Sequence, residues 1–302
     1  MSRLADGHCD IRVRQDTNGA RDEILEMVAG AAAAVTLLTD TVDIEFLDRA
    51  GANLRVVSNV AVGVDNIDLD EAARRGVVVT NTPDVLTEST ADLTIGLLLA
   101  VERRIVEADA FVRSGKPWRW ELRWMLGRDL TGLQLGIVGY GRIGQAVARR
   151  AEAFGMTVVA LDGHSARTAG VTVMHLEELL STSDVVSLHC PLTSETHHMI
   201  GREQLQVMKR SAVLINTARG PLIDEAALVR ALGDGRLGGA GLDVFEFEPD
   251  LSKGLADLPN VVVTPHIGSA GVQTRDAMAL LAVDNVLAVL AGENPETPVV
   301  AK

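Results

Sequence analysis

Three segments of the 302-residue chain place an arginine, a glutamate and a histidine shortly after apolar runs that indicate β-strands. Arg219 follows the run 212–216, Glu248 follows 239–243, and His266 follows 261–264. A guanidinium binds a carboxylate through its planar fork of donors, and an imidazole exchanges a proton near neutral pH. Beside a hydride donor, these groups could reduce a carbonyl group that neighbours a carboxylate.

Each of these side chains suits one part of that reaction. Arg219 would hold the substrate carboxylate and draw electron density from the neighbouring carbonyl oxygen. His266 would supply the proton to that oxygen, which requires a charged ring; a nearby carboxylate favours this form, and Glu248 is the expected partner. Asp243, at the end of its own strand, suits the carboxamide of a nicotinamide. A single arginine or histidine in such a place is more often a surface charge or a structural group.

A hydride donor is indicated by Gly139-x-Gly141-x-x-Gly144, which joins the apolar run 133–138 to a helix. In a dinucleotide site the glycines allow a tight turn, a close approach of the pyrophosphate and close helix–strand packing. The free N–H groups of the helix then face the phosphates. A second strand, 156–161, ends on Asp162, whose carboxylate could accept hydrogen bonds from a ribose. The alternative is a glycine-rich turn in another α/β protein.

Strands and helices are expected to alternate along the chain, which is typical of parallel sheets in an α/β fold. We expect a substrate-binding domain at 1–81 plus 273–302 and a Rossmann-type, doubly wound NAD(P)-binding domain at 82–272. The expected strands are 9–13, 34–38, 54–60, 77–80, 133–138, 156–161, 184–190, 212–216, 239–243 and 261–264. The expected helices are 20–28, 43–50, 69–75, 88–113, 143–154, 177–180, 202–208, 225–232 and 272–290, the last packing on the first domain.

Two loops have unusual compositions. The segment 58–68 leads from a strand into a turn of small residues, whose free N–H groups could bind an anion, although an ordinary loop is the simpler interpretation. The segment 117–124 holds all three tryptophans, Trp118, Trp120 and Trp124. Clustered tryptophans anchor an interface or line a pocket, and core packing is the alternative.

The composition excludes several classes of protein. The net charge of −13 and the pI near 5.0 argue against a nucleic-acid-binding surface. The two cysteines, Cys9 and Cys190, lack the spacing of a disulfide framework or a zinc site, so we expect a cytoplasmic protein without a bound metal. No signal segment or membrane span is expected. The remaining histidines are assigned no chemistry: His8, His164, His175, His189, His197 and His198.

With these residues in hand, the chain resembles the D-isomer-specific 2-hydroxyacid dehydrogenases over nearly its whole length. The segment 61–68 is similar to the substrate loop of the family, 139–144 to its cofactor turn, and 216–220, 243–249 and 265–270 to its catalytic segments. The resemblance implies that Arg219, Glu248 and His266 are catalytic. It also implies that the backbone at Val62 and Gly63 binds the substrate carboxylate and that Arg219 and His266 contact the substrate. The chain is further expected to form a homodimer through the cofactor domain. The cofactor contacts that we expect are Gly139, Tyr140, Gly141, Arg142, Ile143, Gly144, Asp162, Pro191, Thr217, Ala218, Asp243 and Gly268.

Within that family the chain looks most like the glyoxylate/hydroxypyruvate reductases, through Trp124-Met-Leu-Gly and the segment 266–270. A phosphoglycerate dehydrogenase, or another D-2-hydroxyacid dehydrogenase, is the alternative enzyme. An NAD-sensing corepressor of the same fold is the non-enzyme alternative. Phosphite dehydrogenases place a lysine in the substrate loop, where this chain has Val62-Gly63.

Two features depart from that resemblance. Glyoxylate/hydroxypyruvate reductases often carry an arginine after the second strand and use NADPH, whereas Asp162 would repel a 2′-phosphate. We therefore expect NAD, with NADP left open by the nearby Arg167. Relatives also begin with a strand and a helix before the segment that this chain reaches at Cys9. The flavodoxin-like substrate domain is accordingly expected either to lack its first strand or to begin upstream.

Overall fold

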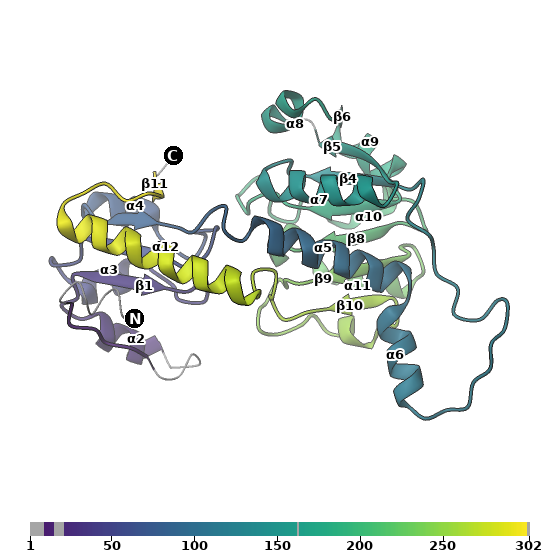
Figure 1. Ribbon diagram of the computed structural model, residues 1–302, viewed down its shortest axis with the longest axis horizontal. Coiled ribbons are helices and arrows are strands. Elements are labelled where there is room, and N and C mark those ends of the chain that lie inside the picture. Colours follow the sequence, from purple (N-terminus) through teal and green to yellow (C-terminus); the bar gives the residue numbers. More distant parts are fainter. Residues whose placement is uncertain (1–8, 15–20, 162, 301–302) are drawn as a thin grey trace. The chain divides into compact units, whose positions relative to one another are not determined.

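The computed structural model describes residues 9–14, 21–161 and 163–300, and it divides into two compact units. The smaller unit comprises Met1–Leu86 and Gly271–Lys302, and the larger unit comprises Thr87–Ala270 (Figure 1). These bounds differ by a few residues from the expected domain boundaries. Both units are built from strands and helices in alternation.

The larger unit contains seven parallel strands in the order β10-β9-β8-β7-β4-β5-β6. The chain adds β5 and β6 on one side of β4 and then adds β7 to β10 on the other side, so the strand order reverses between β4 and β7. In doubly wound sheets, the carboxyl ends of the strands at such a point form a ligand-binding crevice. The predicted α/β class with a Rossmann-type sheet is therefore confirmed. The strands are β4 Gln134–Val138, β5 Thr157–Leu161, β6 Thr172–Met174, β7 Val185–Leu188, β8 Val213–Asn216, β9 Gly239–Leu242 and β10 Val261–Val263.

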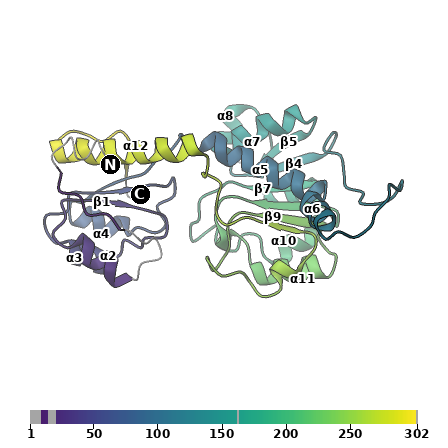
Figure 2. The ribbon, with the colours of Figure 1, turned by 60° about the horizontal axis from the view of Figure 1, so that its bottom comes forward.

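Helices cover both faces of this sheet, and the strands β7, β8 and β9 are therefore buried along their whole length. α5 and α7 pack on one face around Leu98, Ile137 and Val147, while α10 and α11 pack on the other around Leu205 and Leu228 (Figure 2). The helices are α5 Thr87–Glu102, α6 Ile105–Arg113, α7 Arg142–Ala153, α8 His164–Ala169, α9 Leu176–Thr182, α10 Arg202–Val207 and α11 Glu225–Gly233, with 3-10 turns η1 Gly220–Leu222 and η2 Leu255–Asp257.

The smaller unit has a four-stranded sheet in the order β1-β2-β3-β11, in which only β11 is antiparallel. The long helix α12 packs on this sheet through Val286 and Val289 against Val56. The Arg55 guanidinium donates to the carbonyls of Val289 and Leu290 and so satisfies the end of α12. The elements are β1 Ala33–Thr36, β2 Val56–Asn59, β3 Val78–Thr80, β11 Pro298–Val299, α2 Arg21–Val28, α3 Ile44–Ala50, α4 Leu69–Arg74 and α12 Val272–Ala291.

Several expectations about elements are wrong. Residues 9–14 form no strand, and the single helix expected at 88–113 is two helices. The break follows Glu102, because its carbonyl accepts the Arg128 N–H at 2.9 Å and its buried carboxylate pairs with the same arginine. Arg104 then takes a left-handed conformation with φ 53°. Phe154, expected on the buried stripe of α7, lies just beyond that helix and is 43% exposed.

The segment after β8 crosses the segment after β9 in close backbone contact, and Gly220 permits the crossing. A Cβ at this position would lie 1.9 Å from the carbonyl carbon and oxygen of Phe245. Both segments carry residues of the expected active site. The position of these two segments relative to each other therefore depends on the absence of a Cβ at Gly220.

We expect Gly220→Ala to lower the free energy of unfolding by roughly 3 kcal/mol, since the added methyl group must displace backbone rather than a flexible side chain. Urea denaturation followed by circular dichroism measures the change. Gly233→Ala is the matched control, because its Cβ would meet nothing closer than Leu258 Cδ2 at 4.0 Å and a helical alanine is favourable. Equal midpoints for the two variants would contradict the packing argument.

Candidate active site

The carboxyl ends of β4 and β7 form a cradle in which each glycine of the fingerprint has a distinct function. At Gly139, with φ 101°, a Cβ would lie 2.4 Å from the Cys190 nitrogen, so only glycine lets the turn pass the end of β7. At Gly144 a Cβ would lie 2.3 Å from the Gly139 carbonyl oxygen, which confirms close helix–strand packing. At Gly141 nothing lies within 4 Å of that position.

This cradle fits the pyrophosphate of a dinucleotide. Gly141 is the N-cap of α7 and offers no side-chain cap, and the first turn of α7 contains no acidic residue. The amides there are therefore available to an anion, favoured by the helix dipole. Tyr140 and Ile143 pack partly buried against the apolar cluster under the turn, and Pro191 lies exposed just past β7. Asp162, the expected ribose ligand, lies outside the described residues.

The turn after β8 is shaped by Asn216, which is fully buried at the strand end. Its amide donates to the Arg219 carbonyl at 2.8 Å, and its side-chain oxygen accepts the Ala218 N–H at 3.0 Å. The hydroxyls of Thr217 and Thr94 are hydrogen-bonded at 2.9 Å. The Arg219 guanidinium itself donates to the Ala218 carbonyl at 2.7 Å. This turn therefore holds the arginine from both its backbone and its side chain.

Asp243 organises the segment that carries His266. This aspartate is 1% exposed, and its carboxylate accepts the Thr264 hydroxyl at 2.6 Å and the N–H groups of Ile267 at 2.8 Å and Gly268 at 2.7 Å. Its carbonyl accepts the His266 N–H at 2.8 Å. The visible role of Asp243 is thus to position this turn, and its expected contact with nicotinamide stays a prediction, as do those of Thr217, Ala218 and Gly268.

The backbone of His266 is strained, with φ 54°. A left-handed conformation is uncommon outside glycine and persists only where surrounding contacts determine it. The four hydrogen bonds between Asp243 and the segment 264–268 supply those contacts. Such strain at a titratable side chain is typical of functional sites.

Two of the side chains expected to act together, His266 and Arg219, interact with the carboxylate of the third, Glu248. His266 Nδ1 is 2.8 Å from Glu248 Oε2, and the other oxygen, Oε1, accepts the Phe245 N–H at 2.9 Å. Burial by itself raises the pKa of Glu248, but the hydrogen bond and charge of His266, the Phe245 N–H and the charge of Arg219 outweigh it and hold that pKa below its usual value. Glu248 is therefore ionised at neutral pH.

This geometry leaves one imidazole nitrogen for a substrate. Because Nδ1 of His266 faces Glu248, Nε2 is the atom that can give or take a proton. The side chains of His266 and Glu248 are 25% and 30% exposed, which is open enough for access and closed enough to strengthen their pairing. The arrangement can therefore deliver a proton beside a fixed guanidinium.

Val62 and Gly63 belong to the smaller unit, in the loop that follows β2. Asn59 is fully buried at the end of that strand and donates to the Gly63 carbonyl and to Asn66 Oδ1, both at 3.0 Å. Asn66 in turn donates to the Asp40 carbonyl at 2.8 Å. The loop is thus fixed by the buried amide of Asn59 and the half-buried amide of Asn66. Its expected binding of a substrate carboxylate stays a prediction.

Sequence reasoning missed one histidine–carboxylate pair. His198 Nε2 lies 2.7 Å from Glu246 Oε1, although 48 residues separate them, so no spacing in the sequence could reveal the contact. His189, by contrast, is hydrogen-bonded to the Ser187 hydroxyl at 2.8 Å, and burial lowers its pKa to about 4. It is therefore neutral at physiological pH.

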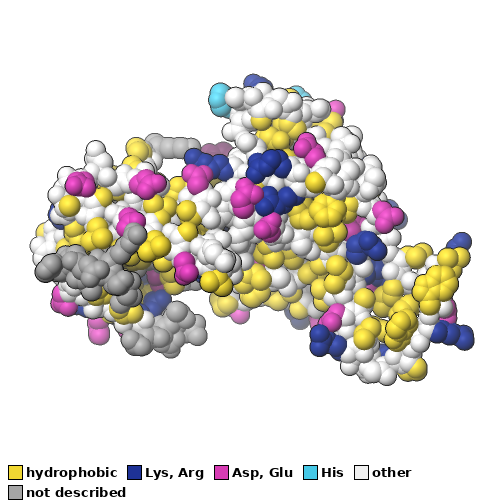
Figure 3. Space-filling model, in the orientation of Figure 1, with side chains coloured by type: hydrophobic (Ala, Val, Ile, Leu, Met, Phe, Trp, Pro, Cys, Tyr) yellow, Lys and Arg dark blue, Asp and Glu magenta, His cyan; other side chains and the backbone are white. Residues whose placement is uncertain are grey.

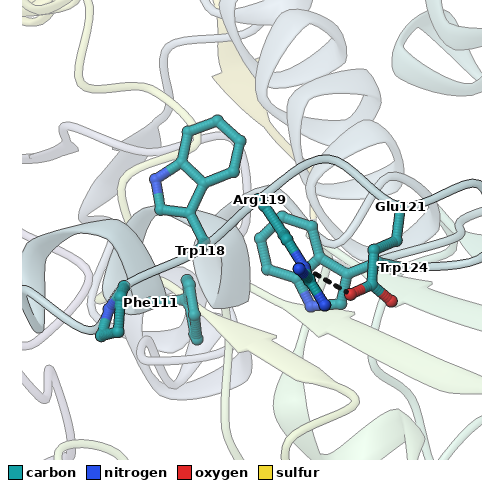
Figure 4. A pocket seen from close by; sticks show the side chains of 6 residues that line it. Phe111, Trp118, Arg119, Glu121 and Trp124 are labelled. Carbon is teal, nitrogen blue, oxygen red and sulfur yellow. Dashed lines mark ion pairs between the residues drawn. The ribbon is translucent and has the colours of Figure 1, made fainter.

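The tryptophan-rich segment forms a projecting arm with α6, and we name α6 and residues 114–128 the tryptophan arm. Trp118 stacks on Trp124 at 5.8 Å, and Phe111 meets Trp124 edge-on at 5.2 Å (Figure 4). Together with Pro117 and the Arg119–Glu121 ion pair, these rings line an open hollow of about 370 Å³. Trp118 and Trp120 are 59% and 77% exposed, so core packing is the wrong interpretation for these two.

Within the described part of the chain, no helix combines the length and apolar character needed to cross a bilayer. The described residues also contain no group of three His, Cys, Asp or Glu side chains that could hold a metal ion. Neither Cys9 nor Cys190 forms a disulfide bond within the described part of the chain.

Comparison with known proteins gives consistent matches. The family described as "D-isomer specific 2-hydroxyacid dehydrogenase, NAD binding domain" matches residues 95–268. A glyoxylate reductase of Thermococcus litoralis is 51% identical over 283 residues, which cover 91% of this chain and 85% of that protein. The crystal structure of the TT0316 protein from Thermus thermophilus has a TM-score of 0.94 and 51% identity, covering 99% of this chain and 96% of that one.

A further solved structure is that of an NADPH-dependent glyoxylate/hydroxypyruvate reductase from Sinorhizobium meliloti, in complex with NADP and malonate. Its TM-score is 0.81 with 37% identity, covering 96% of this chain and 89% of that one. Because the family match spans more than half of the chain and a relative is 51% identical over most of it, the chain belongs to the D-isomer-specific 2-hydroxyacid dehydrogenase family of NAD(P)-dependent oxidoreductases.

Proposed function

We propose that the protein reduces glyoxylate, hydroxypyruvate or a similarly small 2-oxo acid to the D-2-hydroxy acid with NAD(P)H. The observation that carries this proposal is the grouping of His266 and the charge of Arg219 around Glu248. The glycine cradle at 139–144 lies in the same unit. Supporting the substrate class, the glyoxylate reductase of Thermococcus litoralis is 51% identical to this chain.

In this proposal the chain binds and polarises the substrate and moves one proton. Arg219, with the backbone at Val62 and Gly63, binds the substrate carboxylate, and its charge draws electrons toward the adjacent carbonyl oxygen. His266 Nε2 donates its proton to that oxygen, while Glu248 holds the ring through Nδ1 and favours the charged imidazole. A dihydronicotinamide bound at the glycine cradle would supply the hydride for the carbonyl carbon. Oxidation of the hydroxy acid is the same sequence reversed.

We propose NAD as the preferred cofactor. An acidic residue at position 162 disfavours a 2′-phosphate by charge. NADP stays open, because the Sinorhizobium meliloti relative is NADPH-dependent. The phosphoglycerate dehydrogenase and corepressor alternatives predict, respectively, preference for a phosphorylated substrate and binding of cofactor without turnover. A cytoplasmic location remains a prediction from composition.

A panel of 2-oxo acids with NADH and NADPH, read at the absorbance of the reduced cofactor, tests the proposed function. We expect turnover with glyoxylate and hydroxypyruvate, faster with NADH. Arg219→Ala should reduce kcat/KM by roughly a hundredfold or more, because the carboxylate loses its anchor, while the Kd for NADH is retained. Arg210→Ala, an exposed arginine, is the control. Cofactor binding without reduction of any 2-oxo acid would contradict the proposal.

Glu248→Gln should shift the alkaline decline of 2-oxo acid reduction to lower pH. Since the pKa of Glu248 lies below its usual value, the carboxylate is charged throughout the neutral range and favours the protonated imidazole there. Reduction requires that proton, so removing the negative charge makes the rate fall earlier as pH rises. Profiles of kcat/KM against pH measure the shift, with Asp250→Asn as the control on the same segment. A profile that does not move would show that His266 is supported by other groups.

We further propose a homodimer in which the tryptophan arm is covered by a second copy of the chain. No residue of α6 is buried, and Trp120 and Leu122 are 77% and 76% exposed, a density of apolar side chains that monomers rarely leave in water. Figure 3 shows hydrophobic side chains bordered by Lys and Arg over this region. The arm carries Lys116, Arg119 and Arg123 on a chain with net charge −13, which favours another copy as the occupant.

Light scattering after gel filtration measures the number of chains per particle and so tests the proposed dimer. We expect two chains per particle for the unmodified protein and a monomer for the double substitution Trp120→Ser with Leu122→Ser, because the interface loses its apolar centre. Val300→Ser removes an equally exposed apolar side chain elsewhere and should leave the dimer intact. A monomer before substitution, or a dimer after it, would exclude this interface.

A further inference from the structure

The loops that carry Arg219 and Glu248 are joined to each other and to a third loop by backbone contacts. The His198 N–H donates to the Pro221 carbonyl at 2.8 Å, and the Ile200 N–H donates to the Leu222 carbonyl at 3.0 Å. Gly220 lies against the Phe245 backbone, as described above. The segments 196–200, 219–225 and 244–248 therefore support one another, and two of them carry proposed catalytic residues.

Glu246 is the centre of this junction. Its Oε1 lies 2.7 Å from His198 Nε2, and its Oε2 accepts the Glu225 N–H at 3.3 Å, at the start of α11. Its own N–H donates to Glu225 Oε1 at 2.7 Å. Glu246 thus bonds to the His198 loop through its side chain, and to Glu225 through both its side chain and its backbone. We name His198, Glu225 and Glu246 the rear cluster.

Burial of the two carboxyl groups of the rear cluster lowers the free energy of unfolding. Glu225 is 1% exposed, and its Oε2 is buried without a hydrogen-bond partner among the described residues. The Glu246 side chain, which brings a second carboxyl group to the same place, is 13% exposed. A buried, incompletely satisfied acid lowers the stability of a fold, and such groups are typical of places where the geometry that they maintain is needed. Apolar side chains could join three loops at lower cost.

The geometry maintained here is that of Glu248, two residues further along the chain. Phe247 between them is 59% exposed, so the segment is anchored through its flanking residues rather than through this aromatic ring. The Glu248 carboxylate accepts the Phe245 N–H at 2.9 Å and contacts His266 with its other oxygen. Any movement of the Glu246 backbone therefore changes the acceptor that His266 meets.

We propose that His198 and Glu246 are positioning residues for the proposed reaction: a second histidine–carboxylate pair that fixes Glu248, and through it the orientation and charge of His266, without touching substrate or cofactor. The proposal rests on the proposed function. The pair consists of the same residue types as His266 and Glu248, but its role is only to position Glu248. Its effect is on proton delivery and not on cofactor binding.

Substitution of each partner tests this role in the full-length protein. We expect Glu246→Ala and His198→Ala to lower kcat for glyoxylate by roughly tenfold to a hundredfold, because a small displacement of a proton donor is enough for such a loss. Both should move the alkaline decline of kcat/KM toward lower pH and leave the Kd for NADH unchanged. His198→Gln keeps an N–H near the position of Nε2 and should restore most of the activity. His197→Ala is the matched control, because this ring stacks on His198 at 4.0 Å whereas the hydrogen bond to Glu246 is made by His198 Nε2.

A double-mutant cycle shows whether the pair acts through Glu248. In a Glu248→Gln background, Glu246→Ala should shift the pH profile no further, because the group that it positions is already absent. If Glu246→Ala does not fold, His198→Ala provides the same cycle, since this side chain is 37% exposed. An unchanged profile for His198→Ala, or a shift that adds to that of Glu248→Gln, overturns the positioning role. No shift in Glu248→Gln itself would instead overturn the proposed function of Glu248.

Discussion

The hydrogen bond between His266 Nδ1 and Glu248 Oε2 is the contact on which the candidate chemistry depends. It determines which imidazole nitrogen faces outward, and in our proposal the negative charge of Glu248 favours the protonated ring during reduction. The carboxylate can do this only because it stays ionised despite partial burial, with the imidazole, the Phe245 N–H and the charge of Arg219 all favouring the anion. One acid thus connects the proton donor to the group that binds the substrate in our proposal.

Much of the surrounding structure serves to hold that contact in place. Asp243 uses its whole carboxylate to fold the segment carrying His266, whose left-handed backbone would otherwise relax. The rear cluster does the corresponding work for Glu248, and Gly220 lets the two loops approach. Backbone strain and buried acids occur together here. Both are unfavourable for stability, and both are typical of sites where position matters more than stability.

The glycine cradle follows a simpler rule. Gly139 and Gly144 are required because any side chain would overlap the backbone that they cross, whereas Gly141 faces open space that a phosphate can fill. Because these steric requirements select glycine, this part of the molecule could be predicted from the sequence alone. Strand, turn and helix follow one another in sequence, so the contact of Gly144 with the Gly139 carbonyl is local, although that of Gly139 with Cys190 is not.

The sequence by itself determined the α/β class, the glycine turn, and the strands that precede Arg219, Glu248 and His266, because these follow from local residue patterns. Only the tertiary structure decided what depends on distant partners. Arg128 ends α5 by binding Glu102, and Glu246 finds His198 across 48 residues. Such pairings leave no periodic trace, since they arise when separate loops pack together rather than from the spacing of residues along one element.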